Sequence, residues 1–137
     1  MAQLTENQKI GSLGEEIATK FLINKGFTVV LRNYRRKCGE IDIIAKKRGI
    51  LHFIEVKSVS RESSDDSGTI VSHETCVYRP EDNIHPQKMK RLSRAIGLYL
   101  WENFPGIEPE WIFDAITVKL NVKTSKAFVK FIQDITL

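Results

Sequence analysis

Glu40-Ile41-Asp42-Ile43-Ile44-Ala45 and Leu51-His52-Phe53-Ile54-Glu55-Val56-Lys57 are the two stretches that decide the fold. Both are rich in β-branched and aromatic residues, which predicts strands, and the short Gly-containing turn 46–49 between them predicts a hairpin. Side chains alternate across a strand, so Glu55 and Lys57 share one face. Antiparallel pairing of the two strands then brings Asp42 beside Glu55.

Charged residues within such apolar strands call for a chemical explanation. Two neighbouring carboxylates repel each other unless a cation lies between them, and hard oxygen ligands favour Mg²⁺ or Mn²⁺. An ammonium beside the same ion, here that of Lys57, orients or activates a water or stabilises developing negative charge. Two simpler interpretations stay open. Glu55 and Lys57 form a same-face ion pair on a solvated strand, or Asp42 guards a sheet edge against aggregation.

The segment before the first of these strands predicts a helix over residues 5–26 and a strand over residues 27–31 that ends in a basic cluster. Gly11 and Gly14 lie on or beside the apolar stripe of the helix and permit close backbone approach. We therefore expect Glu15, on the flank of that stripe, to be pressed against the sheet edge near Asp42 and Glu55.

Beyond the hairpin, a polar connection at 60–82 is expected to be flexible or to act as a functional flap. Pro86 begins a second predicted helix, which ends before Pro105-Gly106, and strands are predicted over 111–120 and 127–132. This order of elements predicts one α/β domain over residues 1–137, with a central sheet flanked by helices.

Composition narrows the class of protein. The chain has 137 residues, of which 42% are hydrophobic and 28% are charged, and these values exclude wholesale disorder and collagen-like repeats. The two cysteines form no metal-binding or disulfide pattern, which fits a reducing compartment. The polar N-terminus and the lack of a long apolar run predict a cytoplasmic protein with no membrane span. The three histidines have no partners at metal-ligand spacing, so we expect ordinary surface residues.

The basic charge is gathered in clusters. Lys and Arg total 21 against 17 Asp and Glu, for a formal charge of +4. A solvated face is the ordinary explanation of one such cluster, but several around an acidic centre favour binding of a phosphate backbone. The clusters are Arg32, Arg35, Arg36 and Lys37, then Lys46, Lys47 and Arg48, then Lys88, Lys90, Arg91 and Arg94.

Taken in order, these motifs resemble the pattern of the YraN family of uncharacterised bacterial proteins over nearly the whole chain. The residues that carry the resemblance are Gly11-x-x-Gly14-Glu15, Arg32-Asn33, Gly39-Glu40-Ile41-Asp42-Ile43-Ile44, Phe53-Ile54-Glu55-Val56-Lys57, Lys88, Arg91-Leu92, Tyr99-Leu100 and Phe113-Asp114. That family is similar to the PD-(D/E)XK, or restriction-endonuclease-like, nucleases, which include archaeal Holliday-junction resolvases. The resemblance implies an α-β-β-β-α-β core and a role in binding or cutting nucleic acid.

The resemblance also implies roles for single residues. Asp42 and Glu55 would be metal-binding carboxylates, Lys57 would position or activate the water, and Glu15 would be the helix-borne acid. Lys88 or its neighbour Gln87 would contact the substrate. The chain departs from the family pattern in its longer 60–82 connection, at Val59, and at Ile112 and Ala115 around Phe113-Asp114. These departures concern substrate contacts more than the metal site.

These residues are compatible with three functions. The first is a Mg²⁺- or Mn²⁺-dependent endonuclease acting on DNA, including branched or structured DNA, in which Asp42, Glu55 and the carbonyl of Val56 hold the ion. The residues assigned to nucleic-acid binding are Arg32, Arg35, Arg36, Lys37, Gln87, Lys88 and Arg91. The second is a nucleic-acid-binding protein that keeps this fold without cleaving, and the third is a protein-interaction domain that docks through the 60–82 connection. A homodimer would align two sites on two strands.

Overall fold

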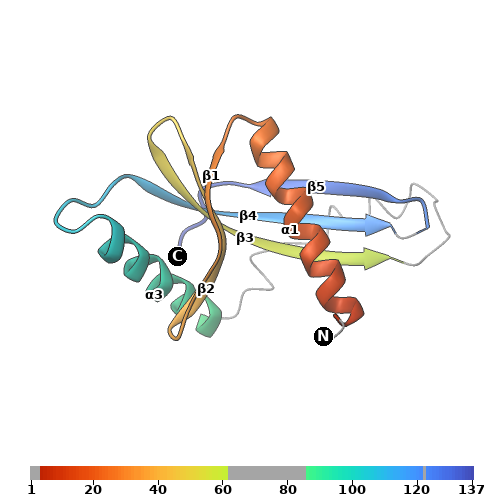
Figure 1. Cartoon of the computed structure of the whole chain (residues 1–137), viewed down its shortest axis with the longest axis horizontal. Helices are drawn as coiled ribbons and strands as arrows, with labels where there is room; N and C mark the ends of the chain where they lie inside the picture. The colour runs from red at the N-terminus through yellow and green to blue at the C-terminus, as the bar shows by residue number, and fades with distance from the viewer. Residues whose placement is uncertain (1–3, 62–85, 122) are drawn as a thin grey trace.

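A computed structural model describes residues 4–61, 86–121 and 123–137 (Figure 1). Two helices pack against one five-stranded sheet, as the sequence predicts for an α/β fold. The elements are α1 (Glu6–Asn24), β1 (Thr28–Arg36), β2 (Gly39–Lys47), β3 (Ile50–Arg61), α3 (Pro86–Asn103), β4 (Trp111–Asn121) and β5 (Lys126–Ile132). Their order contains the expected α-β-β-β-α-β core. Among the described residues, neither helix has the length and hydropathy needed to cross a bilayer.

The sheet is mixed, with strand order β1-β2-β3-β4-β5. Strands β1, β2 and β3 form an antiparallel meander, β4 runs parallel to β3, and β5 returns antiparallel to β4. The turn between β2 and β3 consists of Arg48 and Gly49, with φ of 52° and 80°, the left-handed backbone that a tight hairpin requires. The return from β3 to a parallel β4 requires a crossover, and α3 belongs to this connection.

Helix α1 begins at a capping box. The Thr5 hydroxyl accepts from the Gln8 N–H at 3.1 Å, and the Gln8 side chain accepts from the Thr5 N–H at 2.9 Å. Gly14 packs so closely on β3 that a Cβ at this position would overlap the Ser58 side chain, so the predicted close approach is confirmed there. The same expectation is wrong for Gly11, because nothing lies within 4 Å of a Cβ built on it.

Each face of the sheet has its own apolar core. Ala18 and Leu22 of α1 pack with Ile54 of β3, while Leu92 and Ile96 of α3 lie in the core on the opposite face, with a second set of strand residues. Alternation along β3 divides its side chains between the two helices. In Figure 1, α1 crosses the front of β3, β4 and β5, and α3 lies beside the β1–β2 ribbon.

The observed strands correct two sequence predictions. The first strand does not stop at residue 31, because Arg32, Arg35 and Arg36 of the basic cluster pair with β2 and extend β1 to Arg36. Ser60 and Arg61, which the sequence assigns to a flexible connection, belong to β3 because it pairs with β4 as far as Arg61↔Asn121. The remainder of the expected 60–82 loop lies outside the described residues.

The interior also contains a polar pair that the sequence analysis missed. His52 is buried and its Nδ1 lies 2.6 Å from Oδ2 of Asp114, so the expectation of a surface histidine is wrong at this position. The other carboxylate oxygen of Asp114 accepts the N–H of Asp134 at 2.9 Å, and the Phe27 ring packs edge-on against His52. Burial without loss of hydrogen bonds is possible here because both polar side chains find partners.

One glycine sets the position of α3 relative to the sheet. Gly39, at the start of β2, is buried against α3, where an added Cβ would overlap the carbonyl oxygen of Arg91. Backbone atoms cannot yield as a flexible side chain does, so the first turns of α3 are held next to Glu40. This contact brings the N-terminal part of α3 to the strands that contain Asp42 and Glu55.

Replacement of Gly39 is therefore expected to destabilise the fold. Gly39→Ala should lower the free energy of unfolding by about 1–3 kcal/mol, because the new methyl group has no space. Gly97→Ala is the matched control: Gly97 is an exposed α3 glycine with nothing within 4 Å of an added Cβ, and alanine there should stabilise the helix by about 0.5–1 kcal/mol. Urea unfolding of both variants measures the two effects. Equal stabilities for Gly39→Ala and the wild type would contradict the described packing.

Candidate active site

Asp42 lies where strand β2 separates from β3. The β2–β3 ladder runs from Lys47↔Ile50 to Ile43↔Ile54 and includes no pair at Asp42. The N–H of Val56 donates a hydrogen bond to Oδ2 of Asp42 at 2.8 Å. A side chain thus takes over the bond that a continuing ladder would make, and this fixes the Asp42 carboxylate against the β3 backbone.

Strand β1, the other neighbour of β2, is also irregular opposite Asp42. Asn33 of β1 lies between the pairs Arg32↔Ile43 and Tyr34↔Ile41, opposite Asp42, and its φ is 56°. Asparagine adopts this left-handed conformation more readily than most residues. At Asp42, β2 therefore has no paired residue on β3 among the described residues, and the residue opposite it on β1 has an irregular backbone.

Glu55 is the second carboxylate of the site and comes directly before Val56 on β3. Its side chain is only 12% exposed, and its Oε1 lies 2.8 Å from Nζ of Lys88 in the first turn of α3. The structure therefore brings Asp42 and Glu55 to the same end of the β2–β3 ladder, next to the start of α3. The two carboxylates lie near each other as the predicted hairpin implies, although a side-chain hydrogen bond from Val56, and not a strand pair at Asp42, joins Asp42 to β3.

The pKa values of both carboxyl groups reflect their crowding. Burial raises the pKa of Asp42 to about 7, against the lowering effect of its hydrogen bond from Val56, and Glu15 and Glu40 raise it further. Burial and the charge of Asp42 raise the pKa of Glu55 to about 7, although Lys88 opposes this change. The site therefore holds more negative charge than the one ammonium neutralises.

Glu15 and Glu40 complete the acidic cluster, which we define as Glu15, Glu40, Asp42 and Glu55. Glu15 reaches it from α1, since Gly14 lets the helix approach β3 closely, and its charge raises the pKa of Asp42. Glu40 is exposed and lies 3.7 Å from Arg35. Of the two, only Glu15 is given a role by the resemblance, whereas Glu40 is part of the motif without one; the structure places both within electrostatic range of Asp42.

Lysines 57 and 88 differ from their predicted placement. Lys57 is exposed and forms no ion pair with a carboxylate of the described residues, so the same-face pair with Glu55 is not present. Lys88 takes that position instead. The sequence singles out Lys88 only as a substrate contact, and no local signal could have joined it to Glu55, because the two residues meet through the packing of α3 on the sheet.

The predicted nucleic-acid-binding arginines of β1 each have an acidic neighbour. Arg32 Nη1 lies 3.0 Å from Glu16 Oε1, and Arg36 Nη2 lies 3.6 Å from Glu102 Oε1. Arg36 also stacks on the Tyr34 ring at 4.2 Å, and the Tyr34 hydroxyl donates to Glu102 at 2.6 Å. These contacts hold β1 against both helices and reduce the charge that the arginines present to a polyanion.

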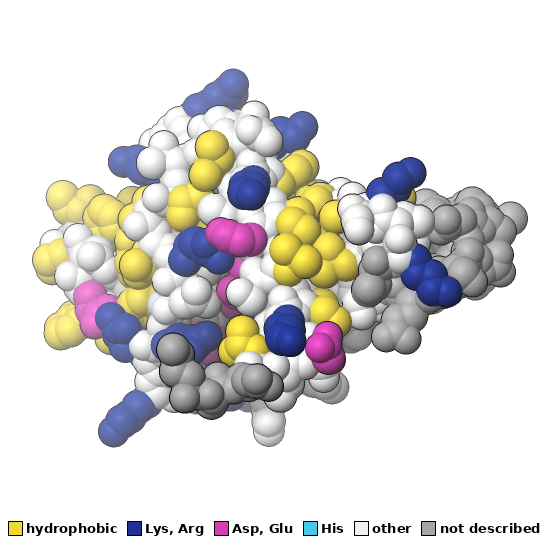
Figure 2. All heavy atoms as spheres, turned by 45° about the vertical axis from the view of Figure 1, so that its right-hand side comes forward, with side chains coloured by type: hydrophobic (Ala, Val, Ile, Leu, Met, Phe, Trp, Pro, Cys, Tyr) yellow, Lys and Arg dark blue, Asp and Glu magenta, His cyan; other side chains and the backbone are white. Residues whose placement is uncertain are grey.

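Other basic and polar side chains remain open to solvent. Lys37, Gln87 and Arg91 are exposed. On the face in Figure 2, Asp and Glu side chains lie in a hollow near the centre, with Lys and Arg side chains around it. Positive charge thus surrounds the acidic side chains on this face of the molecule.

The donor atoms of the site fit a hard divalent cation. Asp42 and Glu55 supply carboxylate oxygens, and the carbonyl of Val56 is a further oxygen on the adjoining backbone. In the described parts of the chain, no three Asp, Glu, His or Cys side chains are gathered closely enough to enclose a metal ion. The ion would therefore keep several waters, as Mg²⁺ usually does in protein sites.

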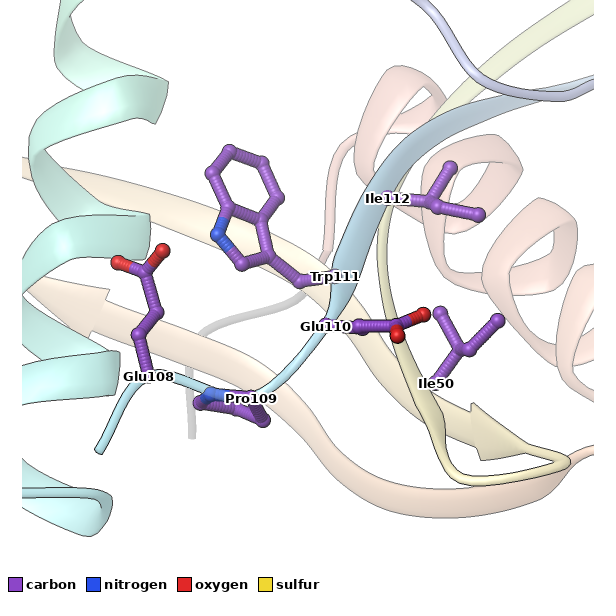
Figure 3. A pocket seen from close by; sticks show the side chains of 6 residues that line it. All are labelled: Ile50, Glu108, Pro109, Glu110, Trp111 and Ile112. Carbon is purple, nitrogen blue, oxygen red and sulfur yellow. The ribbon is translucent and has the colours of Figure 1, made fainter.

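A second hollow lies at the beginning of β3 and β4. It has a volume of about 420 Å³ and is lined by Ile50, Glu108, Pro109, Glu110, Trp111 and Ile112. Figure 3 shows that its side chains come from the start of β4, the segment before it, and the start of β3. Its acidic lining carries no basic group and so disfavours a phosphate backbone.

The raised carboxyl pKa values predict a pH-dependent stability. Unfolded Asp and Glu have pKa values of about 4, so the folded protein retains more protons than the unfolded chain between about pH 4 and pH 7. The free energy of unfolding in EDTA should fall as the pH rises through this window. Asp42→Asn removes one of the repelling charges and keeps an acceptor for Val56.

At pH 8 the free energy of unfolding of Asp42→Asn should exceed that of the wild type by on the order of 1 kcal/mol, or roughly 3 °C in Tm. At pH 5 the difference should be smaller, because the wild-type carboxyl group is then largely protonated. Thermal melts at both pH values measure the effect, and Glu108→Gln, at an exposed position away from the cluster, is the control. A wild-type Tm that rises between pH 5 and pH 8 would contradict the electrostatic account.

Comparisons with known proteins agree with the motifs. The model of the uncharacterised protein family UPF0102 matches residues 14–118. A UPF0102 protein from a Nitratiruptor species is 41% identical over 82% of this chain and 84% of its own, and one from Campylobacter jejuni is 37% identical over 82% and 85%. A further relative from Campylobacter fetus is 34% identical over 92% of both chains. The chain belongs to the UPF0102 family, which is the YraN family that its motifs resemble.

Proposed function

We propose that this protein is a metal-dependent phosphodiesterase that cleaves nucleic acid, with DNA as its substrate. The observation that supports this function is the pairing of two crowded, part-buried carboxylates, Asp42 and Glu55, at the point where β2 leaves β3. Such a pair is electrostatically unfavourable in an isolated protein, and a divalent cation relieves it. The proposed cation is Mg²⁺ or Mn²⁺.

In this scheme the protein supplies position and charge. Asp42, Glu55 and the Val56 carbonyl would hold the ion, with Asp42 kept in place by the Val56 N–H. A bound ion of this kind activates water and neutralises charge on a phosphate. Lys57 lies one pleat beyond Glu55 on β3, and its exposed ammonium is available to orient the attacking water. Glu15 adds negative charge beside Asp42 from the helix side.

The surface chemistry supports a polyanionic substrate. The chain has a formal charge of +4. Exposed Lys88 and Arg91 lie on α3, and exposed Lys37 lies in the turn before Gly39, which packs against α3. Contacts of this kind bind phosphates without reading sequence. Since they carry no base specificity, substrate choice would depend on the shape of the nucleic acid, which is consistent with branched or structured DNA. In this scheme, a second copy of the chain would cut the opposite strand.

A nucleic-acid-binding protein without cleavage activity is the second candidate. The ion pair between Lys88 and Glu55 favours it, because it neutralises one carboxylate without any metal, and Lys57 contacts neither carboxylate. In this alternative the acidic cluster repels phosphates locally, and the surrounding basic residues alone determine affinity.

Cleavage assays distinguish these functions. Purified protein is incubated with labelled single-stranded, duplex, flap and four-way-junction DNA, and with RNA of matched sequence, in Mg²⁺, Mn²⁺ or EDTA. We expect cleavage of DNA with either metal and none in EDTA. Asp42→Asn should reduce cleavage to the EDTA background, and Lys57→Met should slow it by roughly 100-fold.

A control variant and two alternative outcomes complete the cleavage assay. Lys20→Met removes an exposed lysine of α1 and should leave the rate unchanged. If the protein binds nucleic acid in a salt-sensitive way but cleaves none of the substrates with either metal, the proposed nuclease activity is rejected and the non-cleaving binding protein is favoured. A protein that neither binds nor cleaves any of these nucleic acids would contradict both functions. The protein-interaction domain would then be the remaining candidate.

A further inference from the structure

The Lys88 side chain occupies the region where a divalent cation would bind. Its Nζ lies 2.8 Å from Oε1 of Glu55. Glu55, Asp42 and Glu40 all act on it electrostatically. The ammonium is therefore the counter-charge of the acidic cluster in the structure as described.

An ammonium and a divalent ion cannot share this position without mutual repulsion. Like charges a few ångströms apart repel, and the repulsion grows as the site becomes less accessible to water. Glu55 is 12% exposed, so water screens the charges little at this oxygen. Binding of a metal ion to Glu55 therefore requires that Lys88 leave it.

Lys88 has the freedom to leave. Its side chain is 52% exposed, and it extends from the first turn of α3 on a flexible four-carbon stem. The helix backbone stays in place, because Gly39 packs against Arg91 and because Leu92 and Ile96 lie in the core. The ammonium can thus move towards solvent while its Cα remains fixed, and Gln87 and Arg91 are exposed beside it.

We propose that Lys88 is a tethered counter-cation: it binds Glu55 in the metal-free protein, and an entering divalent ion displaces it towards the phosphate of bound nucleic acid. This inference rests on the proposed function and adds a positioning residue to it. It links two events, because the metal ion that completes the site also releases a charge that binds the substrate. Nucleic acid should then bind more tightly when metal is present.

Metal affinity tests the first half of the proposal. Mn²⁺ is titrated into the wild type, Lys88→Met and Lys90→Met at pH 8 and constant ionic strength, and free Mn²⁺ is measured by electron paramagnetic resonance. We expect Lys88→Met to bind Mn²⁺ roughly three- to tenfold more tightly, since the competing cation is gone. Lys90 is an exposed lysine two residues away, and its removal controls for the change in net charge.

Adding Asp42→Asn to Lys88→Met should abolish the gain, which locates the ion in the acidic cluster. Equal Mn²⁺ affinity in the wild type and Lys88→Met, or an equal gain in Lys90→Met, would overturn the proposal. So would the absence of Mn²⁺ binding in every variant.

Substrate affinity tests the second half. Binding of a fluorescein-labelled duplex is measured in EDTA and in Ca²⁺, a larger divalent cation that also prefers carboxylate oxygens. We expect Ca²⁺ to increase the affinity of the wild type and of Lys90→Met, and to have a smaller effect on Lys88→Met. An identical metal-linked gain in all three proteins would contradict the displacement towards phosphate.

The two proposals fail separately. Tighter Mn²⁺ binding by Lys88→Met without any cleavage by the wild type would reject the nuclease and retain the tethered counter-cation. Metal-dependent cleavage with unchanged Mn²⁺ affinity in Lys88→Met would retain the nuclease and reject the role of Lys88.

Discussion

The hydrogen bond from the Val56 N–H to Oδ2 of Asp42, at 2.8 Å, marks the place where β2 and β3 stop pairing, and the site is organised around it. It holds one carboxylate against the backbone of the strand that contains Glu55. Both helices then approach the same region through close glycine contacts: Gly14 lets α1 pack on β3, and Gly39 lets α3 pack on the start of β2. Loss of either contact would move Glu15 or Lys88 away from the paired carboxylates.

In this arrangement the carboxylates of the acidic cluster repel one another, and the protein neutralises only part of their charge. Burial and neighbouring acids raise the pKa values of Asp42 and Glu55 to about 7, and the nearby ammonium of Lys88 offsets part of their charge. Buried like charges that lower stability are typical of sites selected for function. The positive charge of the basic surface is also partly neutralised, because Arg32 and Arg36 of β1 form ion pairs with Glu16 and Glu102. A bound cation would therefore relieve repulsion at the point where the acidic cluster is only partly neutralised.

Local patterns were sufficient to predict the elements and the central pair of carboxylates. The predicted hairpin placed Asp42 near Glu55, and the helix signals predicted α1 and α3 to within a few residues, because these features depend on short-range geometry. The hydrogen bond from Val56 that joins Asp42 to β3 was not part of that prediction. Contacts between distant elements were not predictable in this way. The pairing of Lys88 with Glu55, the Tyr34–Glu102–Arg36 contacts and the buried His52–Asp114 pair all join residues on different elements. The extension of β1 to Arg36 was not predictable either. It depends on pairing with β2, which the composition of the basic segment alone does not indicate.

In the proposed site, the carboxylates of Asp42 and Glu55 jointly hold a divalent cation. Crystals grown with Mn²⁺ and measured near the manganese absorption edge test it directly, because anomalous scattering locates the ion without reference to activity. We expect an anomalous peak in contact with both carboxylates, and the Lys88 ammonium withdrawn from Glu55. No peak at these side chains in the presence of millimolar Mn²⁺, with Lys88 still bound to Glu55, would contradict it.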